Sequence, residues 1–144
     1  MNELQRTKQW FGLAVPTPTE KNKTVQLGVH FEEIGEMFAA MGATELSTAL
    51  ADLALAFKTG QTAHGPIEVS MLPIDRKEML DALCDQIVTA TGVAHMLGMD
   101  ITEAMKRVND SNWSKFVDGK PVFDENGKIA KSSNYYPPDL EGLY

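Results

Sequence analysis

The most constraining feature of this sequence is the eight-residue segment FEEIGEMF at positions 31–38. It holds three carboxylates at EExxE spacing between apolar residues, and the apolar period around it predicts a helix. On a helix, Glu36 lies one turn from Glu32 and three residues from Glu33, so Glu36 can converge with either. Like charges at these spacings repel by about 0.2–0.5 kcal/mol per pair. Such a cluster is stable only where a cation binds it or water reaches it.

A second acidic set lies downstream on another predicted helix. Glu78, Asp81 and Asp85 are spaced at i, i+3 and i+7, which places them on one helix face. Two facing helices that each carry a carboxylate stripe provide the oxygen ligands that Mg²⁺ and Mn²⁺ prefer. We interpret the six carboxylates as a metal site. The alternative is a solvated face, with Glu78 as a capping residue and Asp81 as a surface position.

The periodicity of apolar residues predicts a single all-α domain. A helical core at about 24–113 is followed by a different kind of tail at 114–144, where Asn126-Gly127 is a hairpin signal. Residues 60–73 read as a loop because they are rich in Gly, Pro and polar residues. The expected helices run over residues 3–11, 24–41, 44–58, 75–97 and 100–112, with Asp75 and Asp100 as N-caps.

Composition excludes several classes of protein. The chain has 144 residues, a formal net charge of −7 and no basic stripe, which argues against a nucleic-acid partner. Its one cysteine, Cys84, rules out an internal disulfide and suits a reducing compartment. The N-terminus lacks an apolar signal core, and no apolar run is long enough to span a membrane. We expect a cytoplasmic protein, located in the host cytoplasm if the chain is phage-encoded.

Other metal chemistries do not fit the spacing. A di-iron bundle needs Glu-x-x-His pairs, and no glutamate here has a histidine three residues later. An EF-hand loop that starts at Asp124 would need a glutamate where Tyr135 stands. Zinc is disfavoured by one cysteine and three scattered histidines.

The two acidic motifs and the tail together resemble a known family. EEIGE, followed by EMLDALCDQIVTATGVAHMLGMDITEAM and the tail SNWSKFVDGKPVFDENGKIAKSSNYYPPDL, is similar to the all-α nucleoside triphosphate pyrophosphohydrolases. This superfamily includes the MazG-like and phosphoribosyl-ATP pyrophosphohydrolase-like proteins, and the tail looks like that of short phage and bacterial members. The resemblance covers Leu27 to Leu140. Ala82 departs from the commonest spelling, which leaves open whether Asp81 or Asp85 is the better metal ligand.

The resemblance implies hydrolysis of a (deoxy)nucleoside triphosphate to the monophosphate and pyrophosphate, in helical homodimers or homotetramers. It implies a purine substrate, with (d)GTP favoured, in nucleotide-pool control, and two or three Mg²⁺ ions per site, with Mn²⁺ as a substitute. Glu33 is the candidate base that takes a proton from water. The candidates for base stacking are Trp10, Phe11, Trp113, Tyr135 and Tyr136. The candidates for substrate binding are Asn109, Asn112, Lys115, Lys120, Lys128 and Lys131.

Each of these assignments has a simpler alternative. The lysines can be a solubilising surface, the asparagines can cap a helix, and the aromatic residues can belong to a core or an interface. At the level of the whole chain, the alternative is a non-catalytic helical module that binds a metal or a nucleotide, because binding and turnover use the same carboxylates.

Overall fold

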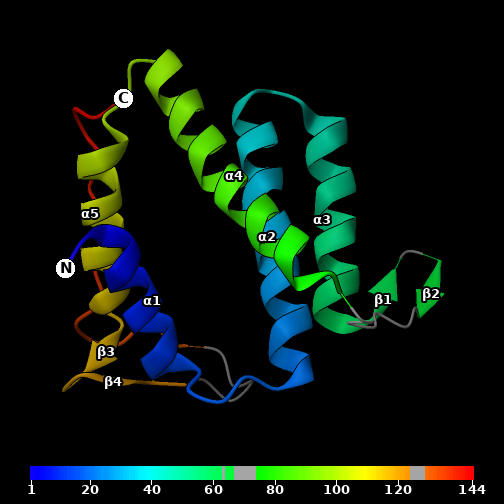
Figure 1. The fold of residues 1–144 in the computed structure, drawn as a ribbon, viewed down its shortest axis with the longest axis horizontal. Coiled ribbons are helices and arrows are strands. Elements are labelled where there is room, and N and C mark those ends of the chain that lie inside the picture. Colours follow the sequence, from blue (N-terminus) through cyan, green and yellow to red (C-terminus); the bar gives the residue numbers. More distant parts are fainter. Residues whose placement is uncertain (63, 67–73, 124–128) are drawn as a thin grey trace. The chain divides into compact units, whose positions relative to one another are not determined.

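The computed structural model of the protein describes residues 1–62, 64–66, 74–123 and 129–144. In these residues the chain is mostly helical, which confirms the all-α expectation (Figure 1). The two sheets have two short antiparallel strands each. The elements are α1 (Glu3–Ala14), α2 (Glu20–Ala40), α3 (Thr44–Thr59), β1 (Gln61–Thr62), β2 (Gly65–Pro66), α4 (Arg76–Met96), α5 (Ile101–Trp113), β3 (Phe116–Val117) and β4 (Lys120–Pro121).

All five predicted helices are present, and two of them extend beyond the predicted bounds by more than one residue. Helix α1 continues through Gly12 to Ala14, because a single glycine costs only about 1 kcal/mol in a helix. Helix α2 begins at Glu20, where Thr19 and Asn22 form a capping box that the apolar period does not reveal. The predicted N-caps Asp75 and Asp100 are confirmed, since both side chains accept hydrogen bonds from N–H groups of the first turn.

The chain divides into two compact units, which are described separately. Unit 1 contains residues 1–16 and 75–144, and unit 2 contains Thr17–Ile74. Unit 1 therefore holds α1, α4, α5 and the tail, whereas unit 2 holds α2 and α3. Helices in the described part of the chain lack the combination of length and hydropathy that crossing a membrane requires.

Unit 2 is a helical hairpin in which α2 and α3 lie side by side (Figure 1). Two buried glycines of α2 allow the close approach. A Cβ atom at Gly28 would lie 2.7 Å from the carbonyl oxygen of Ala54, and one at Gly35 would lie 3.3 Å from Cβ of Leu50. The backbone of α3 thus occupies the space that a side chain at position 28 would need.

Substitution of these glycines tests the packing of the hairpin. We expect Gly28→Ala to lower the free energy of unfolding by about 1–2 kcal/mol, because overpacking against a backbone atom outweighs the gain in helix propensity. Gly35→Ala meets a side chain at a longer distance and should be close to neutral. Gly12→Ala meets nothing within 4 Å and should stabilise the protein by about 0.5–1 kcal/mol. Urea unfolding followed by far-UV circular dichroism measures all three, and equal effects would contradict the close approach.

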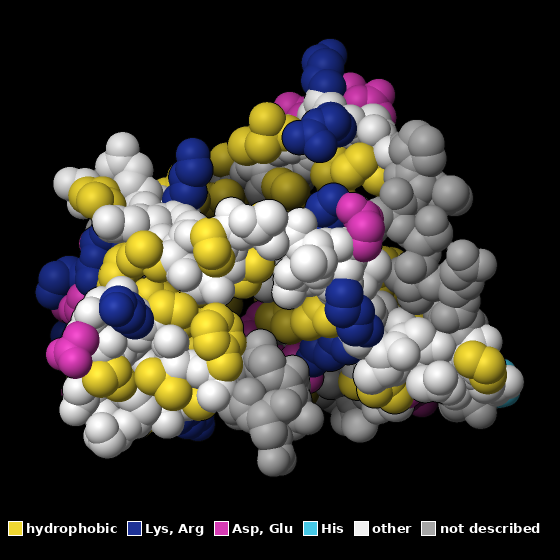
Figure 2. Space-filling view, turned by 90° about the horizontal axis from the view of Figure 1, so that it is seen from below, with side chains coloured by type: hydrophobic (Ala, Val, Ile, Leu, Met, Phe, Trp, Pro, Cys, Tyr) yellow, Lys and Arg dark blue, Asp and Glu magenta, His cyan; other side chains and the backbone are white. Residues whose placement is uncertain are grey.

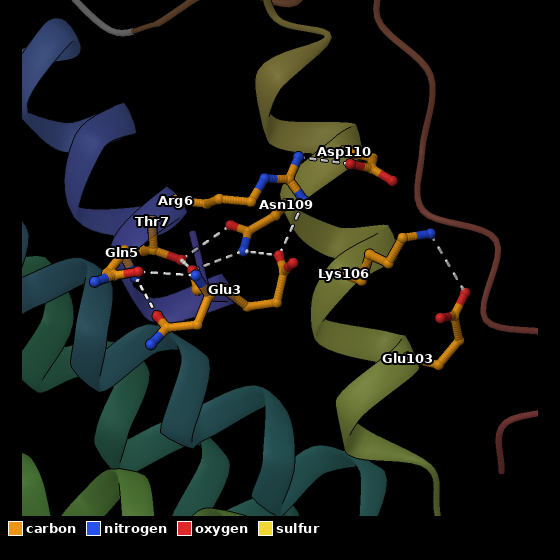
Figure 3. A network of polar contacts seen from close by, with 9 residues as sticks. Glu3, Gln5, Arg6, Thr7, Glu103, Lys106, Asn109 and Asp110 are labelled. Atoms are coloured by element: carbon orange, nitrogen blue, oxygen red, sulfur yellow. Dashed lines mark hydrogen bonds and ion pairs between the residues drawn. The ribbon is translucent and has the colours of Figure 1, made fainter.

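In unit 1, a buried amide joins α1 to α5 (Figure 3). The side chain of Asn109 is 1% exposed, and its Nδ2 donates to the carbonyl oxygen of Glu3 at 3.0 Å and to Oε2 of Glu3 at 2.7 Å. Its Oδ1 accepts from the hydroxyl of Thr7 at 2.9 Å. Arg6 also donates to Asp110 at 2.6 Å, and this hydrogen bond, with the nearby charge of Glu3, raises the pKa of the Arg6 guanidinium.

The tail of unit 1 runs antiparallel along α5. The chain passes from Ser132, beside the C-terminal end of the helix, to Leu143, beside its N-terminal end. Four hydrogen bonds fix this course: Ser132 Oγ to Ser114 O at 2.8 Å, Ser111 Oγ to Tyr136 O at 2.8 Å, Arg107 Nη1 to Asp139 O at 2.9 Å, and Asp100 N to Leu143 O at 2.9 Å. The tail is therefore an integral part of unit 1.

The tail also contains a hairpin that the sequence analysis missed. Strands β3 and β4 are joined through Asp118 and Gly119, which both have positive φ, as a two-residue type I′ turn requires. The Asp-Gly signal was present in the sequence. The predicted Asn126-Gly127 turn lies outside the described residues, although Phe123 pairs with Ile129 on either side of it.

Candidate functional site

The three carboxylates of the EExxE motif lie on α2 and are exposed. Glu32 forms an ion pair with Lys58 of α3, and the two side chains are 47% and 18% exposed. The Lys58 stem passes over Gly28, since its Cγ lies 2.7 Å from the place a Cβ would take there. The missing side chain at position 28 thus gives Lys58 access to Glu32.

The Lys58 contact was not foreseen, because the two residues are far apart in the sequence and meet only when α3 packs against α2. The lysines of α2 itself, Lys21 and Lys23, lie in its first turn, and the cation that pairs with Glu32 comes from the neighbouring helix. The ammonium group of Lys58 offsets part of the repulsion between Glu32 and its acidic neighbours, as can happen on a solvated helix face. An exposed ion pair contributes only about 0–1 kcal/mol to the free energy of unfolding.

The second acidic set lies on α4, where Glu78, Asp81 and Asp85 are all exposed. Glu78 lies 3.9 Å from Lys77, and both side chains are largely in solvent, so the pair contributes little. Glu78, Asp81 and Asp85 lie on one continuous helix, as predicted, so their spacing keeps the three side chains on one face.

The six candidate metal ligands are divided between the two units. Glu32, Glu33 and Glu36 belong to unit 2, whereas Glu78, Asp81 and Asp85 belong to unit 1. Over the residues that the structure describes, no three His, Cys, Asp or Glu side chains are grouped so that they could hold a metal ion. The metal site formed by these six carboxylates remains a prediction.

The structure separates the six candidate substrate-binding residues. Asn109 is buried, and both ends of its amide form hydrogen bonds with α1, so this side chain joins α1 to α5. Lys120 is exposed on β4, and Lys128 lies outside the described residues. The remaining three, Asn112, Lys115 and Lys131, come together.

The two lysines lie at one tyrosine ring, and Asn112 contacts one of them. Nζ of Lys131 lies 4.9 Å from the ring centroid of Tyr135, and Nζ of Lys115 lies 5.9 Å from the same centroid. Lys115 also donates to Oδ1 of Asn112 at 2.9 Å and lies 6.0 Å from the ring centroid of Trp10. We call Asn112, Lys115, Lys131 and Tyr135 the Tyr135 cluster. It is a cationic and aromatic surface site.

Of the other aromatic candidates, Phe11 meets the Trp10 ring edge-on at 5.1 Å between centroids. The Trp10 ring stacks on Phe116 at 5.5 Å between centroids, and Trp113 meets Phe116 at 5.4 Å, so both tryptophans belong to the ring packing of unit 1. Tyr136, in contrast, is 52% exposed. It borders an open pocket of about 310 Å³ between α5 and the tail, whose lining residues are Arg107, Asp110, Tyr136, Pro137 and Asp139.

This pocket differs in charge from the Tyr135 cluster. It contains one arginine and two aspartates, and the guanidinium of Arg107 is already held by Glu103 at 3.0 Å. It therefore offers no surplus positive charge for a phosphate group, whereas the Tyr135 cluster does.

Comparison with known proteins adds no family assignment: the chain matches no protein-family model, no curated protein and no solved structure.

Proposed function

We propose that the protein hydrolyses a (deoxy)nucleoside triphosphate to the monophosphate and pyrophosphate in a Mg²⁺-dependent reaction. The observation that carries the proposal is the pair of acidic motifs, EExxE on α2 and ExxDxxxD on α4, with every carboxylate exposed on a continuous helix. The convergence of two predicted substrate-binding lysines on one tyrosine gives further support. A purine nucleotide, (d)GTP first, is the proposed substrate, and nucleotide-pool control in the cytoplasm is the proposed role.

The candidate ligands fit a hard divalent cation, because all six are carboxylates and none is a thiolate or imidazole. Glu32, Glu33, Glu36, Glu78, Asp81 and Asp85 would hold two or three Mg²⁺ or Mn²⁺ ions. When bound, these ions supply positive charge that activates water and stabilises the leaving pyrophosphate.

The remaining tasks fall to the protein's own side chains. Glu33 takes the proton of the attacking water at its carboxylate. The ammonium groups of Lys115 and Lys131 bind the phosphate chain, with Asn112 beside Lys115. Tyr136, the exposed aromatic residue at the pocket beside α5, is the side chain best placed for contact with a base.

Self-association as a homodimer or homotetramer is part of the proposal. Helix α4 leaves Leu80, Ile87, Val88 and Met96 more than half exposed, and Met41 of unit 2 is exposed as well. Hydrophobic side chains reach the surface at several places on the face shown in Figure 2. A large apolar surface that neither unit covers by itself is typical of interfaces between protein chains.

The proposed reaction is tested by its products. The protein is incubated with each of the eight common NTPs and dNTPs in Mg²⁺, and products are separated by chromatography. We expect monophosphate plus pyrophosphate, with (d)GTP turned over fastest, and no product in EDTA. The protein should stay folded in EDTA, because a hydrated Mg²⁺ site contributes little to the stability of the fold. Turnover in EDTA would refute the carboxylate-metal mechanism, and nucleotide binding without product would instead favour the non-catalytic module.

A further inference from the structure

We propose that the Tyr135 cluster is a polyphosphate-binding site that binds its ligand without a divalent metal. Its ligand class is a linear chain of phosphate groups, such as pyrophosphate or tripolyphosphate. The identification of this ligand with the phosphate chain of the substrate rests on the proposed function. The binding of an anion by the cluster is independent of the proposed function.

The first reason is that two ammonium groups point to one ring. Lys115 comes from the C-terminal side of α5 and Lys131 from the tail, and their Nζ atoms lie 5.9 and 4.9 Å from the ring centroid of Tyr135. The negative face of an aromatic ring attracts a cation, but its quadrupole compensates only part of a full charge. Two like charges gathered in this way are stabilised further by an anion that contacts both.

The second reason is the charge around the two lysines. Within the described residues, neither forms an ion pair with a carboxylate, although the protein has 20 acidic and only 13 basic residues. Some of the other cations have such partners, as Arg6 has Asp110 and Lys58 has Glu32. Among the described residues Lys8, Lys21 and Lys120 also form no ion pair, so what distinguishes Lys115 and Lys131 is that both lie at one ring. With a net charge of −7, the protein as a whole repels anions, so an anion binds only where positive charge is concentrated.

The third reason is that Lys115, Asn112 and the backbone of Tyr135 are held in place before any ligand binds. Lys115 donates to the amide oxygen of Asn112, whose carbonyl oxygen accepts from Trp10 Nε1 at 2.9 Å. On the tail side, the Tyr135 N–H donates to the carbonyl oxygen of Ser132, whose hydroxyl donates to Ser114 of the α5 end. Ordering these groups beforehand lowers the entropy cost of binding.

The chemistry of the cluster favours phosphate chains over other anions. Lysine binds phosphate as a point charge and does not require the bidentate geometry that arginine offers to a single carboxylate. Two separate point charges match a ligand with several charged groups in a row. Because its ring faces the lysines, Tyr135 has a part in phosphate binding, and it is not the base-stacking residue.

The test measures binding of tripolyphosphate to the full chain by calorimetry in EDTA. We expect binding without metal, and a loss of affinity of about tenfold for each of Lys115→Met and Lys131→Met, since each removes a charged hydrogen-bond donor. The controls are the two single variants Lys8→Met and Lys106→Met, each of which removes one positive charge, as each test variant does, at an exposed site of α1 or α5. Absence of binding to the unmodified protein, or an equal loss in the control variants, would overturn the proposal.

Two further variants separate binding from folding. Tyr135→Phe keeps the ring and should bind as the unmodified protein does, whereas Tyr135→Leu should bind more weakly. If Lys115→Met fails to fold, Lys131→Met alone decides, because Lys131 is exposed on the tail. Unchanged tripolyphosphate affinity in folded Lys131→Met would refute the site.

The same measurements distinguish this inference from the proposed function. If tripolyphosphate binds through the cluster but no nucleotide is hydrolysed, the proposed function fails and the anion site stands. If nucleotide is hydrolysed but the lysine variants change neither tripolyphosphate affinity nor KM, the function stands and the anion site fails. When both hold, the lysine variants raise KM with little change in kcat.

Discussion

Glu33→Gln is expected to reduce turnover by about 10²–10⁴-fold while nucleotide still binds, because the amide cannot accept the proton of the attacking water. The substitution keeps the size of the side chain and removes only its charge. Glu33 is exposed on α2, so the variant should fold normally. Removal of one like charge from the stripe should leave the free energy of unfolding unchanged or raise it by about 0.2–0.5 kcal/mol.

Glu36→Gln is the matched control, since it removes the same charge three residues away on the same helix. As a metal ligand without the role of base, it should raise the Mg²⁺ concentration needed for half-maximal activity and recover part of the activity at saturating Mg²⁺. Kinetics across a Mg²⁺ series, together with thermal melts, separate the two roles. Full turnover in Glu33→Gln would refute its assignment as base, and full turnover in both variants would refute the active site.

The helices were predictable from the sequence because each carries its own local signals. Caps such as Asp75 and Asp100 and the 3.6-residue period depend only on neighbours in the chain. The contact of Lys58 with Glu32 was not predictable, because it needs the close packing that Gly28 permits between two helices. A glycine inside a helical pattern is a weak signal, and without the partner helix it does not show which side chain will pass over it.

In the candidate site, too, local features were predictable from the sequence and tertiary contacts were not. The spacing of the carboxylates follows from the helix, so their exposure on one face could be expected. For the two asparagines predicted to bind substrate, the sequence identifies the residue types but not their surroundings. Asn109 and Asn112 lie three residues apart on α5, yet Asn109 is buried against α1 and Asn112 contacts Lys115. Only the tertiary position of α1 separates these two roles.

Asn109→Ala tests this separation and is expected to lower the free energy of unfolding by about 2–4 kcal/mol. It removes one hydrogen bond to a carboxylate and two to neutral groups, and the hydroxyl of Thr7 keeps only the carbonyl oxygen of Glu3 as an acceptor. Both tryptophans, Trp10 and Trp113, lie in unit 1, so urea unfolding followed by tryptophan fluorescence reports on the unit that the substitution affects.

Two companion variants make the result specific. Asn134→Ala removes the same amide from an exposed position of the tail and should change stability by less than about 0.5 kcal/mol. Asn109→Asp keeps the shape of the side chain but turns a carboxylate toward Oε2 of Glu3, where Nδ2 now donates at 2.7 Å. Burial of two like charges side by side should make Asn109→Asp less stable than Asn109→Ala.

Activity of the Asn109 variants then decides between a structural and a substrate-binding role. A structural role predicts lower stability with normal turnover per folded molecule, because the amide has no surface from which to reach a nucleotide. A substrate-binding role predicts the reverse, with unchanged fluorescence melts and a raised KM. The hydrogen bonds to Glu3 and Thr7 use both ends of the Asn109 amide within unit 1, so we expect the first result, and a raised KM at full stability would show that these bonds are exchanged for substrate.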